Sequence, residues 1–319
     1  MAKIKSPFPY FGGKSKVANL VWDKLGDVKQ YIEPFFGSGA VLFRRPESRV
    51  KGKIYEIVND ANGYVSNVWR SLKQYPDKVA EWCDYPVNHA DLSARRRYML
   101  SKKDELLEKL IADYEYCDPQ LAGIWIWGMS CWIGGGFDSG NLNEKICNRP
   151  DLVNNHGCFS IGKIPHIAHD RGIINQEIYK WFEQIADRLR YVKVVCGDWT
   201  KVCGGNWQTD KKPCGMFFDP PYGVKDRSLN CYGDFDTATV ANDVRKWCAE
   251  RGDNPDLRIV LAGYEEHMEL VDDYGWTCEN WHTGGGYANI GKSRGKDNAK
   301  REYLYYSPYC LTDRGLFNG

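Results

Sequence analysis

The sequence lacks several features that would define its class at once. No apolar run approaches the roughly 20 residues that a membrane-spanning helix needs, and no internal repeat or low-complexity tract is present. The 12 cysteines include no Cys-x-x-Cys pair, which disfavours a zinc ribbon. With no secretory signal either, we expect reduced thiols, a cytoplasmic location and no membrane partner.

A strong net charge and an evident metal-binding cluster are also lacking. The formal net charge is only +1, so a polyanionic partner would have to be held by local basic patches. His166 and His169 are spaced i, i+3, but no third ligand accompanies them, so we expect no metal site. Aromatic residues are abundant, with 12 Trp and 20 Tyr, and these serve both as core residues and as stacking surfaces for bases.

The chain alternates apolar runs that end in turn residues with stretches of helical periodicity. This alternation predicts an α/β fold. Helical stripes are expected at 17–25, 174–189 and 240–248. Strands are expected at 31–32, 54–58, 191–196, 216–218 and 257–262, followed by two late, antiparallel candidates at 276–281 and 301–306.

A glycine turn follows the first expected strand. Gly37 and Gly39 form a Gly-x-Gly turn before an expected helix at 41–43, as in the first half of a nucleotide-binding unit. The third glycine of the dinucleotide fingerprint is missing. Asp60 comes 21 residues after Gly39, close to the offset of about 20 at which an acidic residue meets ribose hydroxyls. Together these features indicate an adenosine-containing cofactor.

Asp219-Pro220-Pro221-Tyr222 follows the apolar run 216–218. The prolines cannot continue a strand ladder, so a carboxylate, backbone carbonyls and an aromatic ring meet where a buried strand ends. This set suits a planar ring that carries an amino group. The oxygens can accept hydrogen bonds from the N–H groups of the ligand, while the tyrosine ring stacks on the ligand ring. The alternative is a strand that stops at a Pro-Pro turn with a surface tyrosine.

Other segments admit two interpretations. Gly12-Gly13-Lys14 before a helix could favour an anion or form a simple helix entry. The basic cluster with Arg95 and Arg96, and the later glycine-interrupted loop with Lys292, Arg294 and Lys296, could contact phosphates or be solvated faces.

In this order the segments resemble the D12 class of DNA adenine-N6 methyltransferases, of a phage or prophage type. The motifs that carry the resemblance are 8–14, 33–40, Asn59-Asp60, Gly197-Asp198-Trp199 and Asp219–Tyr222. The resemblance implies a Rossmann-like S-adenosylmethionine-dependent methyltransferase sheet with an inserted, mostly helical target-recognition domain. The catalytic domain would comprise 1–75 and 166–319, and the DNA-reading domain 76–165.

The resemblance also implies residue roles. Asp219, Pro220, Pro221 and Tyr222 would be catalytic. Cofactor binding would fall to Tyr10, Lys14, Glu33, Pro34, Phe35, Gly37, Gly39, Asp60, Asp198 and Asp219. Arg95, Arg96, Lys292, Arg294 and Lys296 would contact double-stranded DNA. We expect a monomer or weak dimer, without a metal, in a bacterial or phage-infected cell.

Other acceptors suit the same four residues. Cytosine N4, an RNA base and a glutamine amide each present a planar amine or amide. From another class, the chain could be an inactive, DNA-binding relative, although Lys14, Asp60, Asp219 and Tyr222 are all present.

Overall fold

The computed structural model describes residues 4–8, 10, 13–48, 52–85, 88–131, 137–138, 176–204, 211–221, 238–281 and 302–312. The chain divides into two compact units. The first comprises Met1–Gly13, Asn59–Asp198 and Ser228–Asp236, and the second comprises Lys14–Val58, Trp199–Arg227 and Thr237–Gly319. The functional division into a catalytic and a DNA-reading domain stays a prediction.

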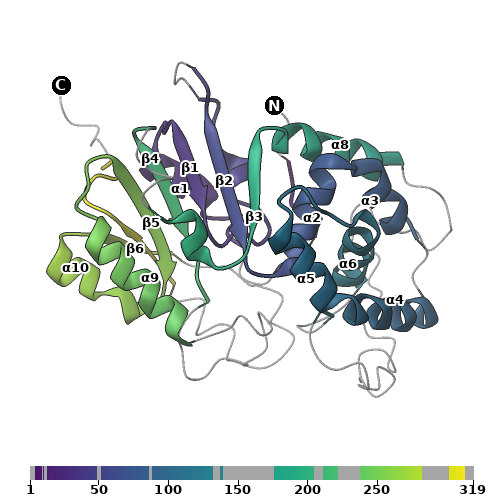
Figure 1. Ribbon diagram of the computed structural model, residues 1–319. Coiled ribbons are helices and arrows are strands. Elements are labelled where there is room, and N and C mark those ends of the chain that lie inside the picture. Colours follow the sequence, from purple (N-terminus) through teal and green to yellow (C-terminus); the bar gives the residue numbers. More distant parts are fainter. Residues whose placement is uncertain are drawn as a thin grey trace. The chain divides into compact units, whose positions relative to one another are not determined.

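The sheet has seven described strands in the order β3-β2-β1-β4-β5-β7-β6 (Figure 1). They are β1 Gln30–Glu33, β2 Tyr55–Asp60, β3 Val192–Cys196, β4 Cys214–Phe218, β5 Leu257–Gly263, β6 Thr277–Asn280 and β7 Tyr303–Tyr306. Strand β1 pairs in parallel with β2 and β4, and β4 pairs in parallel with β5. Strand β7 is antiparallel to both β5 and β6. The predicted α/β class, with its mostly parallel sheet, is confirmed.

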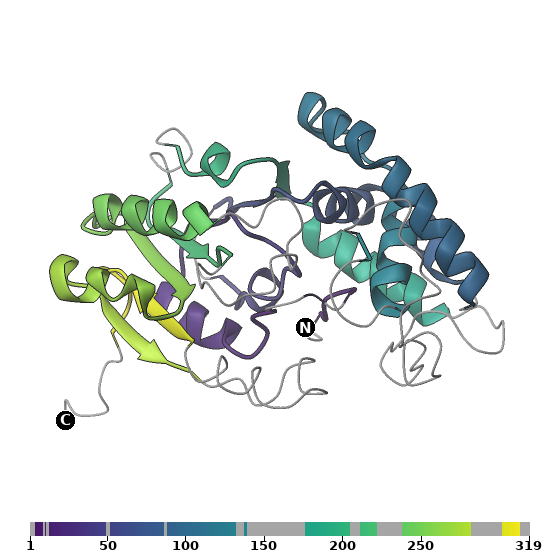
Figure 2. The ribbon, with the colours of Figure 1, turned by 90° about the horizontal axis from the view of Figure 1, so that it is seen from below.

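Helices cover both faces of the sheet in the second unit. Helix α1, Ala18–Leu25, packs against β4 and β5, while Trp247 of α9, Ala238–Arg251, meets Phe218 at the end of β4 with ring centroids 5.2 Å apart. Figure 2 shows purple α1 and green α9 on opposite sides of these strands. Side chains of β4 therefore alternate between the two helices, as the two-residue period of a strand requires. A short helix α10, Glu269–Tyr274, precedes β6.

The first unit is mainly helical. Its described helices are α2 Gly63–Gln74, α3 Pro76–Cys83, α4 His89–Ser101, α5 Lys103–Ala112, α6 Pro119–Cys131 and α8 Gln176–Leu189. Helix α6 carries the tryptophan-rich run, and its Trp125 is fully buried beside Phe8 and Trp69. Aromatic burial of this size explains why the run is a core helix.

One expected helix differs from the prediction. The segment after the glycine turn makes only a short 3-10 helix, η1 Leu42–Arg44. Arg45 leaves the helical region at φ −54° and ψ 125°, because the next residue is Pro46. A proline disfavours the helical conformation in the residue before it and has no N–H to continue the hydrogen-bond ladder.

No helix among the described residues is long and apolar enough to cross a membrane. The eight cysteines whose side chains the structure describes are free thiols, six of them buried.

Arg70 on α2 forms hydrogen bonds with several segments of the first unit. Its Nε donates to the carbonyl of Val194 on β3, and its Nη1 donates to the carbonyls of Leu110, Asp113 and Tyr116. The residue is only 4% exposed. One side chain therefore supplies the hydrogen-bond donors for a strand and for the end of α5.

We predict that Arg70→Met lowers the free energy of unfolding by about 3 kcal/mol or more, since several buried carbonyls lose their donor. Urea unfolding of the full chain measures the change. Arg190→Met is the matched control, because Arg190 forms only an exposed pair with Asp187 in the same unit. Equal stability of the two variants would contradict the role given to Arg70.

Candidate functional site

Asp219 lies directly after β4, whose five residues are all buried. Its Oδ1 is 2.9 Å from Nζ of Lys14, and the two side chains are only 16% and 4% exposed. Pro220 and Pro221 follow it and are buried. The structure therefore brings together one predicted catalytic residue and one predicted cofactor residue that lie 205 positions apart in sequence (219 minus 14).

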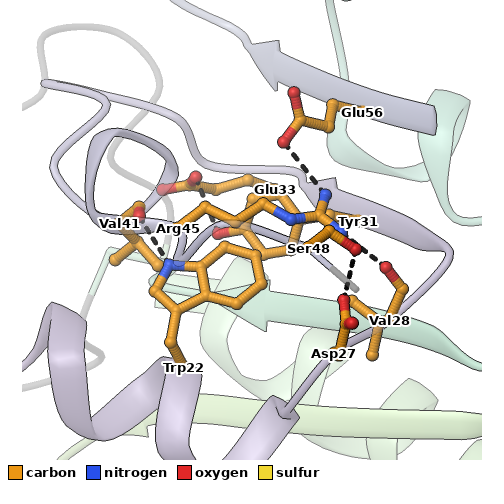
Figure 3. Close-up of polar contacts among 9 residues, drawn as sticks. All are labelled: Trp22, Asp27, Val28, Tyr31, Glu33, Val41, Arg45, Ser48 and Glu56. Atoms are coloured by element: carbon orange, nitrogen blue, oxygen red, sulfur yellow. Dashed lines mark hydrogen bonds and ion pairs between the residues drawn. The ribbon is translucent and has the colours of Figure 1, made fainter. Parts of the chain in front are cut away.

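The end of β1 presents a second buried carboxylate, that of Glu33, which is 2% exposed (Figure 3). The hydroxyl of Tyr31 donates to its Oε2 at 2.8 Å. The two residues are i, i+2 on one strand, so their side chains share a face. Burial raises the pKa of Tyr31 well above its usual value, and the neighbouring Glu33 charge raises it further. Tyr31 therefore stays protonated and serves as a donor.

A further buried ion pair joins β2 to the segment that follows the glycine turn. Nη1 of Arg45 lies 2.9 Å from Oε1 of Glu56, and Nη2 donates to the carbonyl of Val28 (Figure 3). The Arg45 guanidinium also lies 5.1 Å from the ring centre of Trp22, whose Nε1 donates to the carbonyl of Val41. Arg45 thus anchors the segment that follows the glycine turn onto β2 and onto the residues just before β1.

The glycine turn after β1 needs its glycines. Gly37 and Gly39 have φ values of 46° and 67°, in the region that favours glycine. A Cβ atom on Gly39 would also lie 2.9 Å from the ring of Phe36 and 3.0 Å from that of Phe43. Phe35, beside the turn, stacks with Trp199 at 6.3 Å between ring centres. The predicted turn is present. Pro34 and Phe35 lie between the end of β1 and this turn.

In the first unit, Asp60 and Asp198 lie at the ends of β2 and β3. The amide of Asn59 donates to the carbonyl of Gly197, and the Gly197 N–H donates to the carbonyl of Asp60. Oδ1 of Asp60 accepts from the N–H of Asn62, which caps α2. The carboxylate of Asp60 is thereby oriented at the point where strand gives way to helix.

The remaining described candidates have mainly aromatic surroundings. The ring of Tyr10 meets that of Phe8 at 6.0 Å. The Arg95 guanidinium lies 3.9 Å from the ring centre of Tyr85 and 4.7 Å from that of Trp127, and burial lowers its pKa. Arg96 is 1% exposed, and its Nε donates to the carbonyl of Phe137. So buried a guanidinium has no exposed surface to offer a phosphate.

Several predicted residues lie outside the described part of the chain. These are Tyr222, Lys292, Arg294 and Lys296, together with His166 and His169. Among the residues that are described, no group of three or more His, Cys, Asp or Glu side chains could hold a metal ion.

Two residues at this site were missed by the sequence reasoning. Tyr31 could have been found from its i, i+2 spacing to Glu33 on a strand. The charges of Lys14 and Asp219 act on the pKa of Glu302. The sequence gives no local signal for this residue, because its position depends on strand pairing.

Comparison with known proteins agrees with this geometry. Residues 10–119 match the family described as D12 class N6 adenine-specific DNA methyltransferase. Over these residues the chain is similar to that class, and it is an enzyme. The type II methyltransferase M.MjaIII of Methanocaldococcus jannaschii is 26% identical over 254 residues, which cover 73% of this chain and 75% of the relative. The predicted family resemblance is confirmed, and the family implies a methyl donor and a DNA substrate.

We predict that Tyr31→Phe lowers the free energy of unfolding by about 1–3 kcal/mol, because the buried Glu33 carboxylate loses a donor. We also expect weaker binding of the methyl donor, since Glu33 is no longer held in place. Urea unfolding and calorimetric titration with the donor measure the two effects.

Tyr309→Phe provides the control for this prediction. The hydroxyl of Tyr309 also donates to a carboxylate, that of Asp253, but the pair is exposed. Its loss should leave both measurements near the wild-type values, whereas equal losses in the two variants would refute the role of Tyr31.

Proposed function

We propose that the chain transfers the methyl group of S-adenosylmethionine to the N6 amino group of an adenine flipped out of duplex DNA. The observation that carries this proposal is the position of Asp219. It emerges from a buried strand, pairs with a buried Lys14, and precedes two prolines that end the strand. A carboxylate and nearby backbone carbonyls are thereby directed away from the sheet ladder.

The residues at the neighbouring strand ends fit S-adenosylmethionine. The backbone angles at Gly37 and Gly39 favour glycine, and the packing around Gly39 leaves no room for a Cβ atom, so neither residue places a side chain between the turn and a ligand. Glu33 and Asp60 supply carboxylates, which suit a cationic ligand with ribose hydroxyls. We further assign Tyr10, Lys14, Pro34, Phe35 and Asp198 to this cofactor site.

The amino nitrogen of adenine is a weak nucleophile, because its lone pair is delocalised into the ring. S-Adenosylmethionine, when bound, supplies an activated methyl group on a sulfonium sulfur. Asp219 and the carbonyl of Pro220 would accept hydrogen bonds from the two N–H groups of the amino group and so localise the lone pair on nitrogen. Holding the amino group in line with the methyl group would supply most of the rate acceleration.

The target base must leave the double helix to reach Asp219, at a cost of a few kcal/mol. Stacking on Tyr222 would offset about 1–3 kcal/mol of that cost. Arg95, Lys292, Arg294 and Lys296 would hold the DNA backbone, and residues 76–165 would read the target sequence. Arg96 is buried, so the proposed DNA contacts do not include it.

The base and the target site can be determined in one experiment. Expression of the chain in cells that lack adenine methylation, followed by sequencing that detects modified bases, should show N6-methyladenine within one short motif. Incubation of the purified protein with labelled S-adenosylmethionine and duplex DNA, RNA or protein tests the other acceptors. Labelled RNA, or methylation of cytosine N4 alone, would refute the proposal.

We predict that Asp219→Asn lowers the rate of methyl transfer by about 10²-fold or more, because an amide offers a single acceptor and no negative charge to the amino group. DNA binding, measured by fluorescence anisotropy, should change little. A fully active Asp219→Asn enzyme would rule out the mechanism.

Asp256→Asn is the matched control. Asp256 lies just before β5 in the same unit and forms a surface ion pair with Lys212. Its loss removes the same charge at the opposite end of the strands, so the rate of methyl transfer should stay at the wild-type value.

A further inference from the structure

Glu302, the residue before β7, lies at the same edge of the sheet as Asp219. Phe218 at the end of β4 pairs with Leu261 of β5, so Asp219 comes level with Ala262. Ala262 in turn pairs with Leu304 of β7. Because β7 is antiparallel, the residues before Leu304 extend beyond the carboxyl ends of the parallel strands. Two strand spacings of about 4.8 Å separate Asp219 from β7.

The same register places both carboxylates on one face. Residues paired across a sheet point to the same side, and so do residues i and i+2 along a strand. Asp219, Ala262, Leu304 and Glu302 therefore share a face. Helix α1 covers this face, since its Lys24 lies over the ring of Tyr306, two residues beyond Leu304.

Lys14 reaches that face from the segment that leads into α1. Its ammonium contacts Asp219 at 2.9 Å. The charges of Lys14 and Asp219 also act on the carboxyl group of Glu302. Burial is the main cause that raises the pKa of Glu302, while Lys14 lowers it and Asp219 raises it. The ammonium of Lys14 thus pairs with Asp219 and also acts electrostatically on Glu302.

We propose that Glu302 is a positioning residue, which keeps Lys14 paired while Asp219 accepts hydrogen bonds from the amino group of the target base. This role rests on the function proposed above. Lys14 is only 4% exposed, so water cannot replace a lost counter-ion. Without Glu302, the ammonium competes with the target amino group for the oxygens of Asp219. With Glu302, Lys14 exchanges one carboxylate for the other.

Glu302→Gln tests this role, because the amide has nearly the shape of the carboxyl group but no charge. The rate constant kcat for methyl transfer to duplex DNA should fall about tenfold, while KM for DNA and for S-adenosylmethionine stays within about twofold. A merely structural role would lower the amount of folded enzyme without this split. Wild-type kcat in Glu302→Gln overturns the proposal.

Glu279→Gln is the matched control. Glu279 lies on β6, pairs with Leu304 in the sheet register, and accepts a hydrogen bond from the hydroxyl of Tyr306. It is exposed, and an amide oxygen can still accept that bond. The control should keep the wild-type kcat. An equal fall in kcat in both variants overturns a specific role for Glu302.

A titration separates this proposal from the proposed function. Carboxyl carbon NMR follows Glu302 in the full chain without DNA or methyl donor. Its pKa should rise further in Lys14→Met, because a neighbouring cation is lost, and fall in Asp219→Asn, because a neighbouring anion is lost. An unchanged pKa in Lys14→Met overturns the pairing, whatever the enzyme methylates. A wild-type protein that leaves adenine unmethylated refutes the proposed function instead.

Discussion

The ion pair between Lys14 and Asp219 is the interaction on which the site depends. An ammonium that is only 4% exposed has lost most of its water, and such a charge persists only beside an opposite charge. The pair therefore fixes the start of α1 to the end of β4. The same helix covers β4 and β5 and lies over Tyr306 of β7. A single electrostatic requirement thus aligns the amino-terminal segment with the edge of the sheet that carries Asp219.

Buried carboxylates impose a matching requirement elsewhere on the sheet. Glu33 takes a hydrogen bond from Tyr31 on its own strand, and Glu56 on β2 pairs with Arg45. Each acid has a partner that lies either two residues away on a strand or in the adjoining turn. The carboxylates are therefore oriented before any ligand arrives, so less reorganisation is needed on binding.

The strands were predictable because each is an apolar run that stops at an acid or a turn, as in 216–218 before Asp219. The two late strands were also predicted, including their antiparallel direction. The prediction of a helix after Gly39 was wrong, since Pro46 limits this segment to one 3-10 turn. The contact of Tyr31 with Glu33 could have been predicted from the two-residue period of a strand. The position of Glu302 could not, because its place at the same sheet edge as Asp219 follows from two successive strand registers, which link residues 83 positions apart (302 minus 219).

Charge balance explains why two carboxylates and one ammonium suit methyl transfer to an amine. Two negative charges and one positive charge leave the site with one net negative charge when both acids are ionised. In the proposed reaction one positive charge passes from the donor to the amino nitrogen, and it leaves as a proton. A site of net charge −1 complements that positive charge at each stage. Asp219 with Lys14 alone would be neutral, so Glu302 provides the excess negative charge among these three groups, in addition to the carboxylates assigned to the methyl donor.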